Sequence, residues 1–378
     1  MIRRGLVIIL LFILSMLLER THPVELCCVP VNHIPPLRSD QVEAAQRELL
    51  GRAEGRKRAF LGMSTLELLA AGRKYGRALY GEDDRDDLDS ASPPADAQVE
   101  ANMDATVLIV DESIVSQGYD KRWTIDANPL YSYDVCGCER FSSQPSAAAG
   151  FPCSGFLITN RLVLTASHCV PRRTALALRR FVFGFHRRKD GTIPPDYNEH
   201  DVQIAEDIVY RSDPCDAGNA DLALVLLKED IHHKTVELSS IPPKKGDKVY
   251  EIGYPIGLPA KYAPNAKVRH APTTSAYFVT NMDGYDGNSG SPVFDASSHR
   301  VLGVHVRGEI SLARPCGCWT STWCPNNGCS GEEVTRIDRL PLLNQLPQCV
   351  PDTNICSQAP KPPHPQSPFF VWASRKRR

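Results

Sequence analysis

The chain has 378 residues, of which 42% are hydrophobic and 23% charged, and its formal net charge is −1 at pH 7. This composition supports a buried core and excludes a wholly disordered chain. The near-zero net charge removes the general electrostatic reason to expect a nucleic-acid partner. Thirteen cysteines indicate an oxidising compartment and disulfides. Because that number is odd, one thiol is free or pairs between chains.

Residues 1–20 are typical of an export signal, because Arg3 and Arg4 precede an apolar run over residues 6–18. The run is shorter than a membrane span, which favours a secreted or periplasmic protein. No small-residue cleavage site follows it, so an uncleaved anchor that contacts the membrane is the alternative. Residues 21–74 are expected to form a helical propeptide or a spacer, since apolar residues recur there near helical spacing.

The pattern of apolar and turn-forming residues changes at about residue 75. From there to residue 350, short apolar stretches alternate with Gly, Pro, Asn and Asp, which predicts an all-β domain built as a barrel or a sandwich. Residues 351–378 are rich in proline and end in four basic residues, so we expect a disordered tail. Contact of this tail with a surface or a membrane is the alternative.

Three short segments carry residues with the chemistry of amide hydrolysis. They are residues 164–169 around His168, residues 220–224 around Asp221 and residues 287–292 around Ser289. A serine hydroxyl needs an imidazole to take its proton, and a carboxylate on the other ring nitrogen fixes the tautomer of that imidazole. Each residue alone has an ordinary structural explanation, but their joint occurrence in this order predicts a catalytic triad.

The glycines around Ser289 allow a tight turn, which aims backbone N–H groups at the oxygen that becomes negative during hydrolysis. The N–H groups of Gly287 and Ser289 are therefore the expected oxyanion donors. The reaction needs no cofactor and no metal, and its partners are protein or peptide substrates.

The three segments resemble the catalytic motifs of trypsin-like serine peptidases. The run from Gly287 to Phe294 resembles the bacterial secreted branch that includes the glutamyl endopeptidases. The resemblance covers about residues 79–346, and further similar stretches lie at 80–85, 138–141, 253–259 and 328–336. It implies two six-stranded antiparallel β-barrels with the active site between them, and a disulfide between Cys153 and Cys169.

The resemblance also assigns Asp283, His305 and Gly308 to the primary substrate pocket. A carboxylate at Asp283 selects Arg or Lys, whereas a histidine at His305 receives a substrate Glu. We expect cleavage after Arg or Lys, with cleavage after Glu as the alternative. Asn288 departs from the aspartate that animal relatives carry before the nucleophile, so activation through an ion pair with a new N-terminus is not expected.

The cysteines at 316, 318, 324 and 329 form a cluster whose spacing loosely resembles a zinc knuckle. Disulfides are the favoured interpretation in an exported chain, and at least one bridge is expected within the cluster. Two functions other than an active endopeptidase stay open: a catalytically silent homologue used as a binding module, and an adhesive or structural surface protein.

Overall fold

The computed structural model describes residues 78–88, 96–170, 176–212, 220–309, 311–313 and 318–338. The predicted export signal, the helical extension over 21–74 and the tail over 351–378 lie outside these residues. Within them, no helix is both long and apolar enough to cross a membrane.

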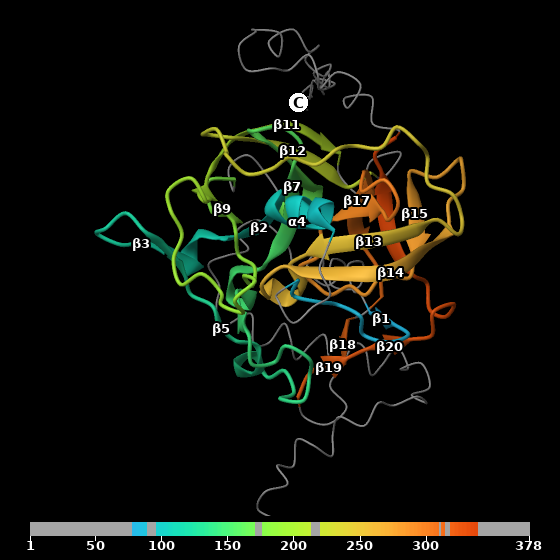
Figure 1. Cartoon of the computed structure of the whole chain (residues 1–378), viewed down its shortest axis with the longest axis horizontal. Helices are drawn as coiled ribbons and strands as arrows, with labels where there is room; N and C mark the ends of the chain where they lie inside the picture. Colours follow the sequence, from blue (N-terminus) through green and yellow to red (C-terminus); the bar gives the residue numbers. More distant parts are fainter. Residues whose placement is uncertain are drawn as a thin grey trace, which may run out of the picture. The chain divides into compact units, whose positions relative to one another are not determined.

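A seven-stranded antiparallel sheet forms the first half of the domain (Figure 1). In spatial order its strands are β10 (Val202–Gln203), β9 (Arg179–Phe183), β2 (Thr106–Asp111), β7 (Cys153–Leu157), β8 (Leu162–Ala166), β12 (Leu222–Leu227) and β11 (Ala205–Ser212). Only Ile204 separates the two edge strands along the chain, so the sheet curls until its edges come near each other. Strands β7 and β8 are buried at every position, and the polar residues in them, Ser154 and Thr165, are buried as well.

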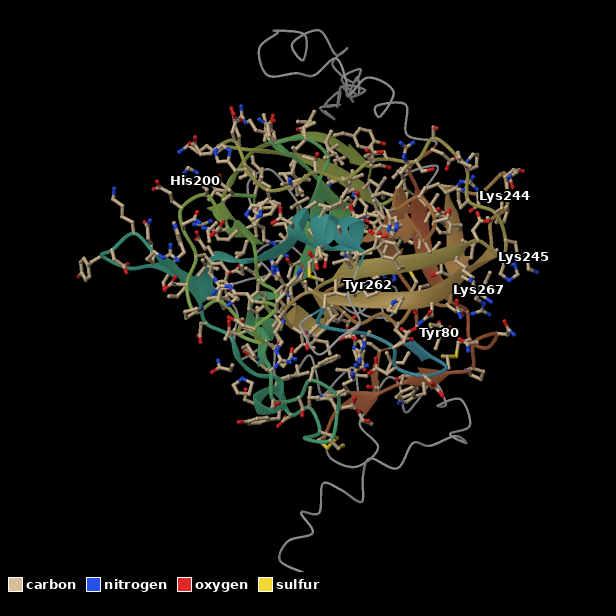
Figure 2. The ribbon with its side chains drawn as sticks, viewed as in Figure 1. Tyr80, His200, Lys244, Lys245, Tyr262 and Lys267 are labelled. Atoms are coloured by element: carbon tan, nitrogen blue, oxygen red, sulfur yellow. A yellow bond between two sulfur atoms is a disulfide. The ribbon has the colours of Figure 1, made fainter. Side chains whose placement is uncertain are left out.

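A closed six-stranded barrel forms the second half. Around the barrel the strands are β13 (Lys248–Gly253), β14 (Lys261–His270), β15 (Tyr277–Thr280), β21 (Glu332–Arg336), β17 (Val301–Arg307) and β16 (Pro292–Asp295). Side chains in β14 alternate with the pleat: Ala266 and Val268 enter the core, while Lys267 between them is exposed (Figure 2). The core of the barrel also contains Phe278, Val293, Leu302 and Val334.

The all-β prediction is confirmed, and the two halves contact each other through β13 against β2 and β17 against β8. The first half is also consistent with the six-stranded barrel that the resemblance implied, because β10 and β11 are two parts of one strand, which pairs with β9 through β10 and with β12 through β11. The chain passes from β10 directly to β11 through one residue, so these two strands continue one another instead of pairing side by side.

The remaining elements are short. The two-residue or three-residue strands outside the two main sheets are β1 (Leu79–Tyr80), β3 (Val115–Gln117), β4 (Trp123–Ile125), β5 (Asn128–Pro129), β6 (Pro145–Ser146), β18 (Leu312–Ala313), β19 (Thr320–Ser321) and β20 (Trp323–Cys324). Single turns of 3₁₀ helix are η1 (Glu112–Ile114), η2 (Leu130–Tyr133), η3 (Ala148–Gly150), η4 (Ser167–Cys169) and η5 (Pro255–Gly257). Strand β1 runs parallel to β20, which attaches the beginning of the described chain to the barrel half.

Helix α4 (Ala97–Asp104) is the one α-helix among the described residues, and a histidine holds its last residue in place. His233 Nδ1 lies 2.8 Å from Asp104 Oδ1, and its Nε2 lies 3.1 Å from Asp201 Oδ1. Burial acts to lower the pKa of His233, but the hydrogen bonds with the two carboxylates outweigh it and raise the pKa to about 9. His233 therefore joins the helix to the loop before β10 as a charged ring.

Replacing His233 with Gln should destabilise the protein in a pH-dependent way. Because the pKa of His233 is raised on folding, its contribution to stability is complete below the unfolded value of about 6.5 and is lost as the pH rises through 9. The difference in melting temperature between wild type and H233Q should thus be largest near pH 6 and small above pH 9. A difference that grew with pH would contradict this assignment.

Candidate active site

The pairing of β8 with β12 brings His168 and Asp221 together. Leu222 pairs with Ala166, so the residue before β12 lies beside the residues that follow β8. His168 is in the turn η4 directly after β8, and Asp221 directly precedes β12. His168 Nδ1 lies 3.0 Å from Asp221 Oδ2. The sheet register alone therefore positions the imidazole against the carboxylate.

The Asp221 carboxylate is fully buried and is held by three donors. Ser167 Oγ donates to its Oδ1 over 2.7 Å, and the backbone N–H of His168 reaches the same oxygen over 3.2 Å. Burial acts to raise the pKa of Asp221, but the attraction of His168 and these hydrogen bonds lower it to about 2. The carboxylate is thus charged at neutral pH and accepts a hydrogen bond from the Nδ1–H of the ring. Ser167 is a site residue that the sequence analysis missed, although it directly precedes His168.

Ser289 reaches the histidine from the barrel half. It lies in the loop before β16, and its Oγ is 2.6 Å from His168 Nε2. Ser154, in β7, fixes the loop: its N–H donates to the Ser289 carbonyl over 2.7 Å, and its Oγ donates to the Gly287 carbonyl over 2.8 Å. Serine, histidine and aspartate are therefore linked in series by hydrogen-bond distances, in the arrangement expected from the sequence.

The glycine next to the nucleophile is required by a close approach of backbones. Gly290 has φ +90°, and a Cβ on it would lie 2.0 Å from the Ser154 carbonyl oxygen and 2.3 Å from Thr165 Oγ1. Any side chain would push Ser289 away from Ser154, because the β7 backbone occupies the space. Gly287, one of the two expected oxyanion donors, has φ +104°, and a Cβ on it would lie 2.4 Å from the Tyr254 carbonyl oxygen.

A disulfide joins Cys153, at the start of β7, to Cys169, directly after His168. The same two sulfurs lie near the His168 ring, but they offer no metal site because both are already bonded to each other. Cys136 is bonded to Cys318 and Cys324 to Cys329, and Cys138 is disulfide-bonded as well. The expected bridge within the cysteine cluster is confirmed by Cys324 and Cys329, whereas residue 316 lies outside the described residues.

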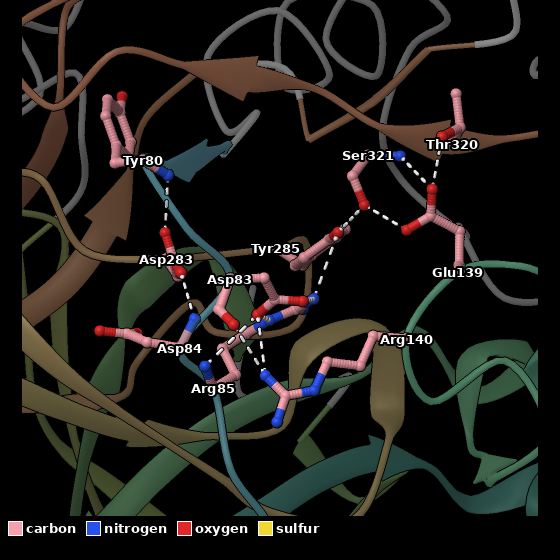
Figure 3. Close-up of polar contacts among 10 residues, drawn as sticks. All are labelled: Tyr80, Asp83, Asp84, Arg85, Glu139, Arg140, Asp283, Tyr285, Thr320 and Ser321. Atoms are coloured by element: carbon pink, nitrogen blue, oxygen red, sulfur yellow. Dashed lines mark hydrogen bonds and ion pairs between the residues drawn. The ribbon is translucent and has the colours of Figure 1, made fainter. Parts of the chain in front are cut away.

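Asp283 accepts hydrogen bonds from the beginning of the described chain (Figure 3). The backbone N–H of Tyr80 donates to its Oδ1 over 2.6 Å, and that of Asp84 to its Oδ2 over 3.2 Å. Burial raises the pKa of Asp283 to about 8, even though the Tyr80 hydrogen bond and Arg85 act to lower it. Asp283 therefore anchors the segment of residues 80–84, and at neutral pH its carboxyl group is largely uncharged.

The segment around Asp283 is fixed by further polar contacts. Arg85 is buried, pairs with Asp83 over 2.7 Å and lies over the ring of Tyr285, with its guanidinium carbon 4.2 Å from the ring centre. Tyr285 OH in turn contacts Ser321 Oγ (Figure 3). A cavity of about 380 Å³ next to Asp283 includes no triad residue and is lined by Tyr80, Gly81, Glu82, Asp84, Pro264, Asn265, Ala266, Asn281, Asp283 and Asn326.

The other two expected pocket residues also have internal neighbours. His305 is fully buried in β17, with Nδ1 2.6 Å from Glu251 Oε1 and Nε2 2.9 Å from Glu332 Oε2. A Cβ on Gly308 would lie 1.8 Å from Glu332 Oε2, so this glycine lets the carboxylate pass close to the backbone. The structure thus gives both Asp283 and His305 internal hydrogen-bond partners.

Residues 153–304 match the family model of the trypsin-like peptidase domain, which is less than half of the chain. A comparison with curated proteins finds no match. Among solved structures, the active form of the Rv3671c protease from M. tuberculosis is 16% identical, with 66% of this chain and 83% of that chain covered and a TM-score of 0.36. The inactive form of that protease is also 16% identical, with 67% of this chain and 92% of that chain covered and a TM-score of 0.37.

A structure of Deg5 is 16% identical as well, with coverages of 64% of this chain and 87% of that chain and a TM-score of 0.36. The residues that match the trypsin-like peptidase domain include His168, Asp221 and Ser289.

Removing the disulfide that follows His168 should weaken the fold. The double variant C153S/C169S opens a loop with a sequence separation of 16, which should lower the free energy of unfolding by about 3 kcal/mol. C324S/C329S is the matched control, since its separation of 5 predicts a smaller loss of about 2 kcal/mol. Denaturant unfolding without reductant measures both. Peptide mapping that found free thiols at 153 and 169 would contradict the assignment.

Proposed function

We propose that this protein is a secreted serine endopeptidase that hydrolyses peptide bonds through an acyl-enzyme formed on Ser289. The observation that carries the proposal is the series of contacts from Asp221 through His168 to Ser289, with distances of 3.0 and 2.6 Å. Nucleophile, base and orienting carboxylate lie at the separations that proton transfer needs. The family match at residues 153–304 supports the same reaction class.

In this mechanism Ser289 Oγ attacks the substrate carbonyl carbon while its proton passes to His168 Nε2. Asp221, charged because its pKa is about 2, stabilises the imidazolium that forms. The N–H groups of Gly287 and Ser289 stabilise the negative oxygen of the tetrahedral intermediate. His168 then gives its proton to the leaving amine, and a water deprotonated by the same ring hydrolyses the acyl-enzyme.

A silent homologue acting as a binding module is the second candidate. No specific contact favours it, because the nucleophile, the base and the glycines beside the nucleophile are all in place. A role as an adhesive surface protein would depend on residues 6–18 and on the tail, which lie outside the described residues. Export, removal of residues 21–74 as a propeptide and membrane contact are parts of the proposal that depend on the sequence alone.

Replacing Ser289 with Ala should leave the fold intact and reduce peptide hydrolysis on the order of 10⁶-fold, by analogy with nucleophile removal in other serine proteases. Asp221→Asn should cost on the order of 10⁴-fold, because the wrong histidine tautomer is then favoured. Steady-state hydrolysis of a peptide mixture measures both, with circular dichroism as the control for folding. Normal turnover by S289A would refute the proposed mechanism, and failure of a fluorophosphonate to label wild-type Ser289 would favour the silent homologue.

For the primary specificity we propose cleavage after Arg or Lys rather than after Glu. Near His305 two carboxylates, Glu251 and Glu332, surround one ring, so this part of the barrel does not offer a free cation to a substrate carboxylate. Such an acidic surrounding favours a basic substrate side chain by electrostatic complementarity. The resemblance also assigns Asp283 to the pocket, where its ionised carboxylate favours a basic side chain, and its pKa of about 8 delays that ionisation to mildly alkaline pH.

Cleavage of a peptide library by the wild-type protein tests the specificity. We expect products that end in Arg or Lys, and a preference that strengthens between pH 7 and pH 9 as Asp283 loses its proton. Asp283→Ser should remove this pH dependence more than it lowers general activity. Wild-type protein that cut only after Glu, and lost this preference on replacement of His305, would show that the opposite specificity holds.

A further inference from the structure

The side chain before the nucleophile is attached to a buried glutamate. Asn288 Nδ2 donates to Glu251 Oε2 over 2.9 Å, and both side chains are almost completely buried. A carboxylate oxygen can only accept, so the contact fixes which end of the Asn288 amide faces Glu251. An aspartate at 288 would instead place two carboxylates against each other. Glu251 therefore explains why position 288 is Asn and not the Asp found before the nucleophile in animal relatives.

The contact continues across the interior of the barrel. Glu251 in β13 reaches His305 Nδ1 in β17 over 2.6 Å, and His305 Nε2 reaches Glu332 Oε2 in β21 over 2.9 Å. The backbone N–H of Ala78 donates to the other oxygen of Glu332 over 3.3 Å. Three barrel strands and the first described residue are thus joined in one chain of polar contacts that ends at Asn288.

The charges in this chain compensate one another. Each nitrogen of His305 faces a carboxyl group, so the two contacts need two hydrogens, which the ring and the two glutamates hold between them. With two hydrogens among them, the three groups carry one negative charge together, and the Asn288 amide and the Ala78 N–H donate to the two glutamates. Removing any one partner leaves a buried charge with fewer hydrogen bonds, which is strongly unfavourable.

The chain of contacts holds the loop that carries the expected oxyanion donors. Asn288 lies between Gly287 and Ser289, whose N–H groups are those donors. Backbone contacts of His305 reinforce the attachment, since its carbonyl accepts from Gly290 N over 2.8 Å and its N–H donates to the Ser291 carbonyl over 2.9 Å. The same histidine therefore contacts the loop through its backbone and, by way of Glu251, through a side chain.

We propose that Glu251, His305 and Glu332 are positioning residues for catalysis, which hold Asn288 and thereby orient the N–H groups at 287 and 289 for the tetrahedral intermediate. The inference rests on the proposed peptidase function. It adds to that function the contacts that hold the loop around Ser289 in place. The three residues act through Asn288, so their effect falls on kcat and on affinity for transition-state analogues, with substrate binding largely kept.

A charge swap between Asn288 and Glu251 tests this proposal. Asn288→Asp alone opposes Glu251 with a second carboxylate and should lower kcat about 100-fold, comparable to the loss of one oxyanion donor, with KM changed less than about threefold. The double variant N288D/E251Q restores the hydrogen bond with donor and acceptor exchanged, since the amide of the new Gln donates to the new Asp and its oxygen accepts from His305. It should recover kcat to within about tenfold of wild type.

Inhibition by a peptide aldehyde separates positioning from a general loss of structure. Its inhibition constant should rise in N288D in parallel with the loss of kcat and fall again in the double variant, because the bound hemiacetal oxygen uses the same N–H donors. A fall in folded protein would reduce the amount of active enzyme without changing this constant. An unchanged inhibition constant in N288D would overturn the proposal.

A second pair of variants controls for the removal of a buried histidine. His233 also lies between two carboxylates, but it packs on Phe183 of β9 in the sheet half, outside the triad contacts. H305Q should lower kcat by tenfold or more, on the order expected when oxyanion donors lose their orientation. H233Q should lower the melting temperature and leave kcat unchanged. Equal kcat in the two variants, or a double variant N288D/E251Q no better than folded N288D, would overturn the proposal.

The experiment distinguishes this inference from the proposed function. Wild-type protein that hydrolyses no peptide refutes the peptidase function itself. Wild-type protein that hydrolyses peptides, together with N288D and H305Q variants of wild-type kcat, refutes the positioning role and leaves the function standing.

Discussion

The contact of Ser154 with the nucleophile loop is the constraint on which the site depends. Through its backbone N–H and its hydroxyl, this one residue of β7 holds the carbonyls of Ser289 and Gly287, and its hydroxyl also accepts from the N–H of Tyr254. His168 and Asp221 belong to the sheet, whereas Ser289 belongs to the barrel. No strand pairing joins the two main sheets among the described residues, so this contact, together with others such as that of Thr335 Oγ1 with the Ala220 carbonyl, brings the three side chains together.

Buried charge organises both halves of the domain, and the same chemical unit serves two purposes. An imidazole lies between two carboxylates at His233 in the sheet half and at His305 in the barrel half. At His233 the unit joins a helix end to a loop. At His305 it leads to the residue beside the nucleophile. The two histidines make the same type of interaction. They differ in role because only His305 is connected to the loop that carries Ser289.

The sequence was informative where function requires particular residues close together along the chain. The turn around Ser289 and the histidine beside Cys169 carry their chemistry within a few residues, so neighbouring positions are enough to recognise them. The primary substrate pocket was harder to predict from the sequence. Asp283 and His305 are defined by what lies opposite them in space, and their partners come from residues 80–84, from Glu251 and from Glu332, which are distant in sequence. Glu251 gave one signal, a charged residue between Tyr250 and Ile252 in the buried part of β13.

The sequence by itself determined the β-rich class of the domain, the triad candidates and the disulfide candidates, because turn residues, alternation and short motifs act over a few neighbouring positions. Only the tertiary structure decided that one strand of the first half is divided into β10 and β11, that Ser167 and Ser154 support the triad, and that Asp283 and His305 face internal partners. These features depend on strand register and on which buried polar groups meet across the two halves. Burial forces each such group to find a partner, and folding alone determines which partner is within reach.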